Sequence, residues 1–212
     1  VREDPSKGKT LADSMVRGIH MMLHEALDAA VKERLIVRNP TNGTTVPKPN
    51  YPDKQVLDDG QLEKFLGMIE AYPDWRDFFY TECMTGLRRG EICGLKWSDI
   101  NERESTIRIE RSIACTPESG VVISTPKTVN SIRTIPVMPS TLTLLQQYKR
   151  QMQAEHPNTI LKNAFLFPNK EDIFLPRDPN SVTRRVKRFM KNNDFPDLSP
   201  HDLRHSCATL LL

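Results

Sequence analysis

The sequence predicts a mainly helical α+β protein that carries a small three-stranded antiparallel sheet. Three observations lead to this fold class. Apolar residues recur at the spacing of an α-helix through several long segments. Three short runs of strand-like sequence follow one another between residues 106 and 137. The 212 residues, of which 38% are hydrophobic, are enough to bury the core of one or two globular domains.

The first predicted element is a long amphipathic helix over residues 11–36, which the Asn39-Pro40 pair is expected to end. Its apolar surface is too large for an isolated helix, so we expect its packing partners to lie outside this sequence. A polar, proline-rich stretch follows, as is typical of a linker. We therefore expect residues 1–46 to form a helical unit with its linker, and residues 47–212 to form a larger domain.

The larger domain opens with a capping box, in which Asp58 and Gln61 precede an apolar stripe at helical spacing. A second helix should run from about Asp74 to Met84, bury two phenylalanines, and end at Gly86. A short helix around Glu91 follows. The remaining expected strands and helices are Thr106–Ile109, Val121–Thr125, Ile132–Val137, Thr141–Gln153, Ser181–Lys191, and a last helix that begins at Ser199-Pro200. The apolar pattern of that last helix is still running where the sequence stops, so we expect the chain to be a fragment.

Charge is distributed unevenly on a chain whose net charge is only +3. Residues 51–124 carry 9 Lys and Arg against 14 Asp and Glu, whereas residues 125–191 carry 12 against 4. A basic region of this kind fits either a solvated surface or a localised contact with a polyanion. No run is apolar enough to span a membrane, and the four cysteines lack paired spacing, which indicates reduced thiols in a cytoplasmic protein.

Two arginines stand at element boundaries far apart in the sequence. Arg88 follows a Thr-Gly turn, and Arg204 lies in the first turn of the last helix, three residues after His201. Guanidinium groups gathered from distant segments suit a phosphate whose negative charge grows during a reaction. Transfer of a phosphodiester also needs proton donors, and Lys127 with His201 completes a set that could act without a metal or another cofactor.

The segments around these residues resemble the motifs of the tyrosine recombinase and integrase family. They are Thr85–Ile100, Thr125–Val137 and Ser199–His205, and the helix before Asn39-Pro40 is similar to the last helix of the family's core-binding domain. Within this family, the sequence most resembles integrases of conjugative transposons and of phages of Gram-positive bacteria. The resemblance implies a tyrosine-recombinase catalytic domain preceded by part of a core-binding domain. The catalytic residues that it implies are Arg88, Lys127, His201 and Arg204.

Supporting roles are expected for other residues. Glu91, one turn along from Arg88, should orient that guanidinium, and His205 is expected to be structural. His20 and His24 have the spacing of a zinc helix, but no third ligand is evident, so we predict no metal site there. The residues predicted to contact DNA are Arg17, His20, His24, Arg133, Arg184, Arg185 and Arg188.

The family's nucleophilic tyrosine would lie beyond Arg204, and none of the four tyrosines in this sequence has that context. The resemblance therefore implies a recombinase that cuts and rejoins DNA through a 3′-phosphotyrosyl link to integrate or excise a mobile element, of which this chain binds DNA without cleaving it. Its partner would be double-stranded DNA, bound by a dimer at each site and a homotetramer on two duplexes, with the bacterial nucleoid in the cytoplasm as its location. The alternatives are a non-catalytic DNA-binding module of the same fold and a type IB topoisomerase.

Overall fold

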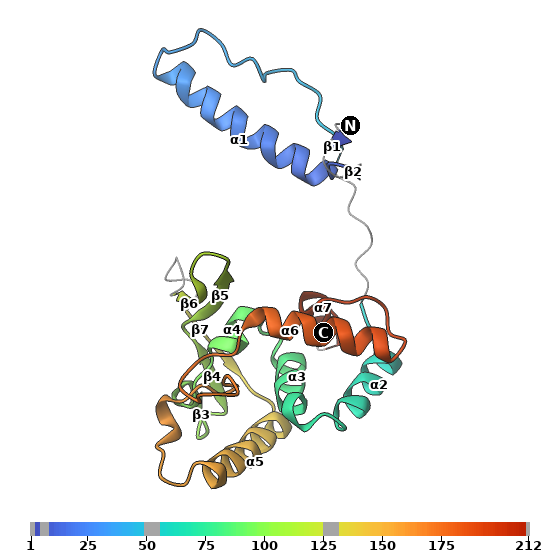
Figure 1. Ribbon diagram of the computed structural model, residues 1–212, viewed down its shortest axis with the longest axis vertical. Coiled ribbons are helices and arrows are strands. Elements are labelled where there is room, and N and C mark those ends of the chain that lie inside the picture. Colours follow the sequence, from blue (N-terminus) through green and yellow to red (C-terminus); the bar gives the residue numbers. More distant parts are fainter. Residues whose placement is uncertain (1–2, 5–8, 49–55, 125–131, 211–212) are drawn as a thin grey trace. The chain divides into compact units, whose positions relative to one another are not determined.

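The computed structural model describes residues 3–4, 9–48, 56–124 and 132–210, and the chain divides into two compact units, Val1–Asp53 and Lys54–Leu212 (Figure 1). The first unit contains the short antiparallel strands β1 (Glu3–Asp4) and β2 (Lys9–Thr10) and the long helix α1 (Asp13–Lys32). No residue of α1 is buried, and its apolar side chains Met15, Ile19, Met22 and Leu23 are 42% to 66% exposed.

Helix α1 ends earlier than the sequence predicts. Arg34 adopts the left-handed conformation with φ of 59°, and the amides of Arg34 and Leu35 donate to the carbonyls of Val31 and Ala30. This is a Schellman motif, which terminates a helix by satisfying its last carbonyls. The prediction that the Asn39-Pro40 pair ends the helix was therefore wrong.

Asn39 instead fastens the segment after the helix to α1. Its side-chain amide donates to the carbonyl of His24 at 3.0 Å and to Asp28 at 2.6 Å, while its oxygen accepts from the amide and hydroxyl of Thr41. The three α1 residues that were predicted to contact DNA also reach this segment. His24 bonds Thr41 and His20 bonds Thr44 through their ring nitrogens, and Arg17 donates to the carbonyl of Pro47.

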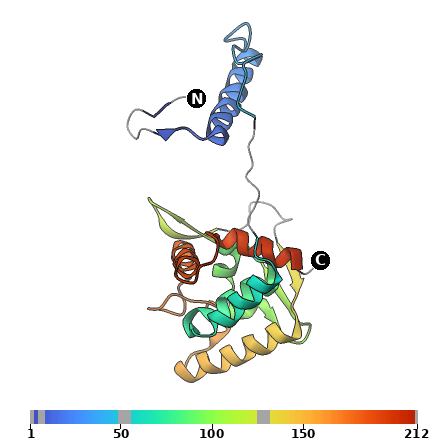
Figure 2. The ribbon, with the colours of Figure 1, turned by 90° about the vertical axis from the view of Figure 1, so that its right-hand side faces the viewer.

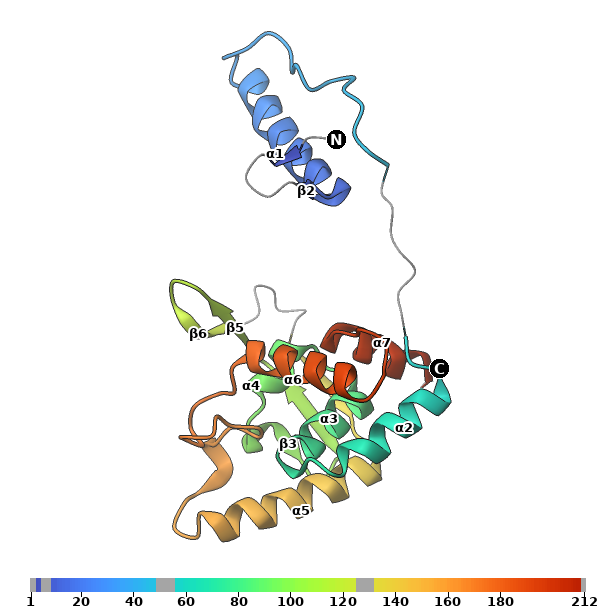
Figure 3. The ribbon, with the colours of Figure 1, turned by 45° about the vertical axis from the view of Figure 1, so that its right-hand side comes forward.

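The second unit is mostly helical, as predicted. Helices α2 and α3 lie between α5 on one side and the pair α6 and α7 on the other (Figures 1, 2 and 3). The predicted capping box of α2 is present, because Asp58 accepts from the amide of Gln61 and Gln61 accepts from the amide of Asp58. Gly86 ends α3 with φ of 57°, as expected. The helices are α2 (Asp59–Ile69), α3 (Pro73–Thr85), α4 (Arg89–Gly94), α5 (Pro139–Glu155), α6 (Pro179–Asn192) and α7 (Pro200–Leu210), with 3-10 turns η1 (Trp97–Asp99) and η3 (Leu161–Asn163).

The strands pair differently from the expectation. A three-stranded antiparallel sheet is present, but its order is β3 (Ile100–Asn101), β4 (Thr106–Ile109) and β7 (Arg133–Pro136). The strand predicted near residues 121–125 is β6 (Gly120–Ser124), which pairs instead with β5 (Ser112–Thr116) in a separate hairpin. That hairpin projects from the body of the unit in each of the three views (Figures 1, 2 and 3). The fold class is confirmed, but the grouping of the three strands into one sheet was wrong.

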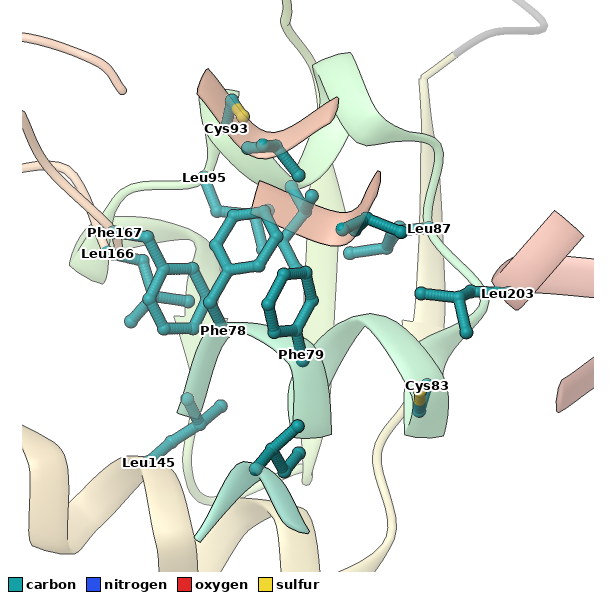
Figure 4. Close-up of a cluster of buried hydrophobic side chains, with 14 of the residues drawn as sticks. Phe78, Phe79, Cys83, Leu87, Cys93, Leu95, Leu145, Leu166, Phe167 and Leu203 are labelled. Carbon is teal, nitrogen blue, oxygen red and sulfur yellow. The ribbon is translucent and has the colours of Figure 1, made fainter. Parts of the chain in front are cut away.

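The core forms where α3 meets the helices and the sheet around it. Phe78 and Phe79 of α3 are each 1% exposed, as predicted, and their rings pack edge to face. Figure 4 shows Leu87 and Leu203 at the margin of the same cluster, one from the segment before α4 and one from α7. Segments more than 100 residues apart in the sequence are therefore fixed against one apolar cluster.

Candidate active site

A cleft of about 520 Å³ brings together three of the four predicted catalytic residues. Arg88 reaches it from the start of α4, and His201 and Arg204 reach it from the first turns of α7. The hairpin strand β5 and Thr183 of α6 complete the wall. The β5 residues in the lining are Ser112, Ile113, Ala114 and Cys115, and the remaining lining residues are Leu87, Arg89, Gly90, Ser199 and Pro200.

Both arginines are anchored by a buried neighbour. Leu87, directly before Arg88, is 1% exposed, and Leu203, directly before Arg204, is fully buried. Both leucines belong to the same hydrophobic cluster. Burial of such side chains stabilises the fold by roughly 2 kcal/mol each, so the backbone at each arginine is held by the core.

Glu91 holds Arg88 at the N-terminus of α4. Its carboxylate accepts from the backbone amide of Arg88 at 2.8 Å and from the Arg88 guanidinium at 2.9 Å, and it also receives two hydrogen bonds from Arg133 at 2.8 and 2.9 Å. Burial raises the pKa of the Glu91 carboxyl, but the hydrogen bonds from Arg133 and Arg88 outweigh burial and bring the pKa down to about 2. Glu91 is therefore an ionised anchor and is unsuited to serve as a general base.

Arg204 brings a buried guanidinium nitrogen to the cleft. Its Nη1 is buried and makes no hydrogen bond to any residue within the described ranges. Burial lowers the pKa of this guanidinium, and the positive charge of Arg88 lowers it further. A buried donor without an acceptor costs roughly 1–3 kcal/mol, and two like charges facing one cleft add to the cost. An anion between Arg88 and Arg204 would relieve both costs.

His201 is exposed on the first turn of α7, where it can meet a ligand in the cleft. Its Nε2 lies 3.0 Å from Nε2 of His205, one turn further along the helix. The turn itself is held by Ser199 and Asp202, since the Ser199 amide and hydroxyl both donate to the Asp202 carboxylate at 2.9 and 2.6 Å. Lys127, the fourth predicted catalytic residue, falls outside the described residues.

Two cleft residues were not predicted from the sequence. Arg89 enters the wall of the cleft and donates to the hydroxyl of Thr183, which lies on α6. Gly90 permits the close approach of α4 to the hairpin, because a Cβ built there would lie 2.5 Å from Ser112 Oγ and 2.6 Å from the carbonyl oxygen of Ile113. The pairing of Arg89 with Thr183 spans 94 positions and has no signal in local spacing. Gly90 lies in the segment Thr85–Ile100, which resembles a family motif, but the sequence predicted no role for it.

The residues of the second unit that were predicted to contact DNA lie in different environments. Arg184 and Arg188 are exposed on α6, and Arg184 forms an exposed ion pair with Asp178 at 3.3 Å. The guanidinium of Arg185 instead lies 4.7 Å from the ring centroid of Tyr72. Arg133 is engaged with Glu91, as described above. Contact with DNA stays a prediction for each of them.

Within the described part of the chain, no group of three or more His, Cys, Asp or Glu residues is arranged to hold a metal ion. Among the same residues, no helix is long and apolar enough to cross a membrane.

Comparison with known proteins gives a consistent result. Among curated proteins, the ICEBs1 integrase of Bacillus subtilis (strain 168) is 29% identical over 212 residues, which cover 95% of this chain and 55% of that protein. The transposase from transposon Tn916 of Enterococcus faecalis is 29% identical over 167 residues, which cover 74% of this chain and 40% of that protein. The chain spans about half the length of the curated relatives it matches.

Solved structures resemble the chain along nearly all of its length. The Tn1549 transposon integrase in complex with transposon right end DNA matches with a TM-score of 0.79 and 25% identity, over 97% of this chain and 68% of that one. The lambda integrase bound to DNA has the same fold, with a TM-score of 0.63 and 20% identity over 93% of this chain and 65% of that one. The model of the phage integrase family matches residues 55–212. This match covers the whole cleft and the core beneath it, and the chain belongs to the phage integrase family.

Proposed function

We propose that this chain forms the phosphate-activating part of a site-specific DNA recombinase of the tyrosine class. One observation carries the proposal. Arg204 lines the same cleft as Arg88 and His201, and its buried Nη1 has no hydrogen-bond partner among the described residues, so two guanidinium groups meet there without an anion between them. A phosphodiester of the DNA backbone is an anion that would use two guanidinium groups and a proton donor together.

The proposed reaction assigns a task to each group. A tyrosine oxygen forms a bond to phosphorus while the bond from phosphorus to the 5′ oxygen breaks, which leaves a 3′-phosphotyrosyl link. Arg88 and Arg204 would neutralise the charge that builds on the nonbridging oxygens, and His201 faces the same cleft. Lys127 is proposed as the group that gives a proton to the leaving 5′ oxygen, with His201 supporting proton transfer at the nucleophile.

The nucleophile is proposed to come from outside these 212 residues. Of the tyrosines that the structure describes, none lines the cleft. Tyr148 is unsuited to the task, because burial raises the pKa of its hydroxyl to about 12. Tyr72 packs edge to face against Phe189. We therefore expect this chain alone to bind DNA without forming a covalent adduct.

DNA as partner is supported by the Tn1549 and lambda integrases, whose structures were determined in complex with DNA. The exposed arginines of α6, Arg184 and Arg188, are proposed to contact its phosphates. A dimer at each site and a tetramer on two duplexes, acting on a mobile element in the bacterial nucleoid, complete the proposal. Relatives that are themselves an integrase and a transposase support recombination over type IB topoisomerase activity.

The test replaces Arg88 with lysine in the gene product that carries the nucleophile. Arg88→Lys keeps the charge but loses the planar fork, so DNA affinity, which is spread over many contacts, should change little. Covalent protein–DNA adduct should form on the order of a hundredfold more slowly, the typical cost of losing one donor to the transition state. Adduct formation at the wild-type rate would contradict the proposed site. Absence of adduct from the unaltered protein would favour the non-catalytic DNA-binding module.

A further inference from the structure

We infer that Arg133 is a positioning residue, which keeps the Glu91 carboxylate fully occupied and so leaves the outer donors of Arg88 free for the anion in the cleft. The inference rests on the proposed function only for the identity of that anion. Arg133 was predicted from the sequence to contact DNA, whereas the structure places its guanidinium on Glu91.

The hydrogen bonds at Glu91 are saturated. An ionised carboxylate offers about four acceptor positions. Two of them take the backbone amide and Nη1 of Arg88, and the other two take Nη1 and Nη2 of Arg133, each at 2.8 or 2.9 Å. The carboxylate side chain is 8% exposed, so water has little access to compete. Arg133 thus supplies half of the donors that Glu91 requires.

Arg88 is held at one point. Only its Nη1 contacts Glu91, and its other guanidinium nitrogens make no hydrogen bond to the described residues. Its side chain is 64% exposed, whereas that of Arg133 is 33% exposed. The arrangement leaves the remainder of the Arg88 fork facing the cleft, where two oxygens of one phosphate could accept from it.

Loss of Arg133 would turn Glu91 into a competitor for Arg88. The carboxylate would keep its backbone bond but have two open acceptor positions, and Arg88 would be the guanidinium already in contact with it. Arginine and carboxylate favour a two-pronged geometry, so Glu91 would draw a second nitrogen of Arg88 away from the cleft. A structural role for Arg133 alone would weaken the fold without redirecting Arg88.

The first measurement follows the guanidinium of Arg88 by ¹⁵N NMR, with its signals assigned through Arg88→Lys. In Arg133→Gln, rotation about the Nε–Cζ bond of Arg88 should slow, because two prongs would be held instead of one. Inorganic phosphate, titrated into the same samples, should bind about tenfold more weakly, the loss expected for one charge-assisted hydrogen bond. Arg108→Gln is the matched control, since Arg108 lies on the adjacent strand β4 and pairs with Glu110 away from the cleft.

The second measurement removes the competitor. In the double variant Glu91→Gln with Arg133→Gln, the neutral amide should release Arg88, so that its rotation and its phosphate affinity return to within about twofold of the original protein. If Arg133→Gln does not fold, Arg133→Lys leaves one acceptor open and should give an intermediate effect. Unchanged rotation in a folded Arg133 variant, or failure of the double variant to restore it, overturns the inference. Absence of any phosphate response in the unaltered chain would instead count against the proposed function, and the rotation data would still decide the role of Arg133.

Discussion

Replacement of Glu91 by glutamine tests how much the ionised Glu91 carboxylate contributes to the free energy of unfolding. The pKa of Glu91 falls from its ordinary value of 4.5 to about 2, although burial alone would raise it. A shift of this size corresponds to about 3 kcal/mol in favour of the folded state. Because the folded pKa is depressed, this stability is present above pH 4.5 and is lost as the pH falls from 4.5 towards 2. Glutamine keeps one acceptor for the Arg88 amide but cannot carry the charge.

Glu91→Gln should therefore lower the free energy of unfolding by up to about 3 kcal/mol at pH 7, and the deficit should shrink through the window from 4.5 to 2. Urea titrations followed by tryptophan fluorescence report on the second unit alone, since both tryptophans, Trp75 and Trp97, lie in it. The exposed Glu63 of α2 supplies the control Glu63→Gln, which should show a small deficit throughout. An equal deficit for Glu91→Gln at pH 7 and pH 2.5 would refute the ion-pair account.

Three further predictions concern other parts of the chain. Gly90→Ala should destabilise the second unit by about 1–3 kcal/mol in urea titrations, because the new Cβ would collide with the hairpin. The control is Gly67→Ala in α2, where a Cβ would meet no atom within 4 Å, and this change should be neutral or slightly stabilising. Equal effects of the two changes would contradict the close approach of α4 to the hairpin. Removal of Arg184 and Arg188 should weaken DNA binding about equally for all sequences and make the affinity less sensitive to salt, because fewer phosphates are then neutralised by the protein; weakening restricted to one sequence would argue against backbone contact. Asn39→Ala should expose the segment after α1 to limited proteolysis, and unchanged digestion would mean that its hydrogen bonds do not hold that segment.

Local signals in the sequence predicted most helices well. The capping box at Asp58 and the glycine stop at Gly86 each rest on residues within a few positions of one another, and both are present in the structure. The end of α1 was misplaced because its signal is weak. An arginine seldom adopts the left-handed conformation, so Arg34 gave no indication of the Schellman motif, while the later Asn-Pro pair did resemble a stop.

Long-range pairing was the part that the sequence could not supply. Strand β5, with the sequence Ser-Ile-Ala-Cys-Thr, combines residues of mixed strand preference and was not predicted, so its partner β6 was assigned to the wrong sheet. The residues of the cleft also divide into those with a local sequence signal and those that depend on long-range contacts. Arg88, His201 and Arg204 were found through motifs around them, whereas the contact of Arg133 with Glu91 spans 42 positions and depends on how β7 meets α4.

The buried leucines beside the two cleft arginines would link the packing of the core at high temperature to the affinity of the cleft for an anion. Leu87 and Leu203 occupy one apolar cluster, so the backbone positions of both arginines depend on how that cluster packs. Substitutions far from the cleft that loosen this cluster should broaden the distribution of separations between the two guanidinium groups before the domain melts. Among relatives adapted to different growth temperatures, amino-acid differences would then concentrate in this apolar cluster, while the charged residues of the cleft stay unchanged.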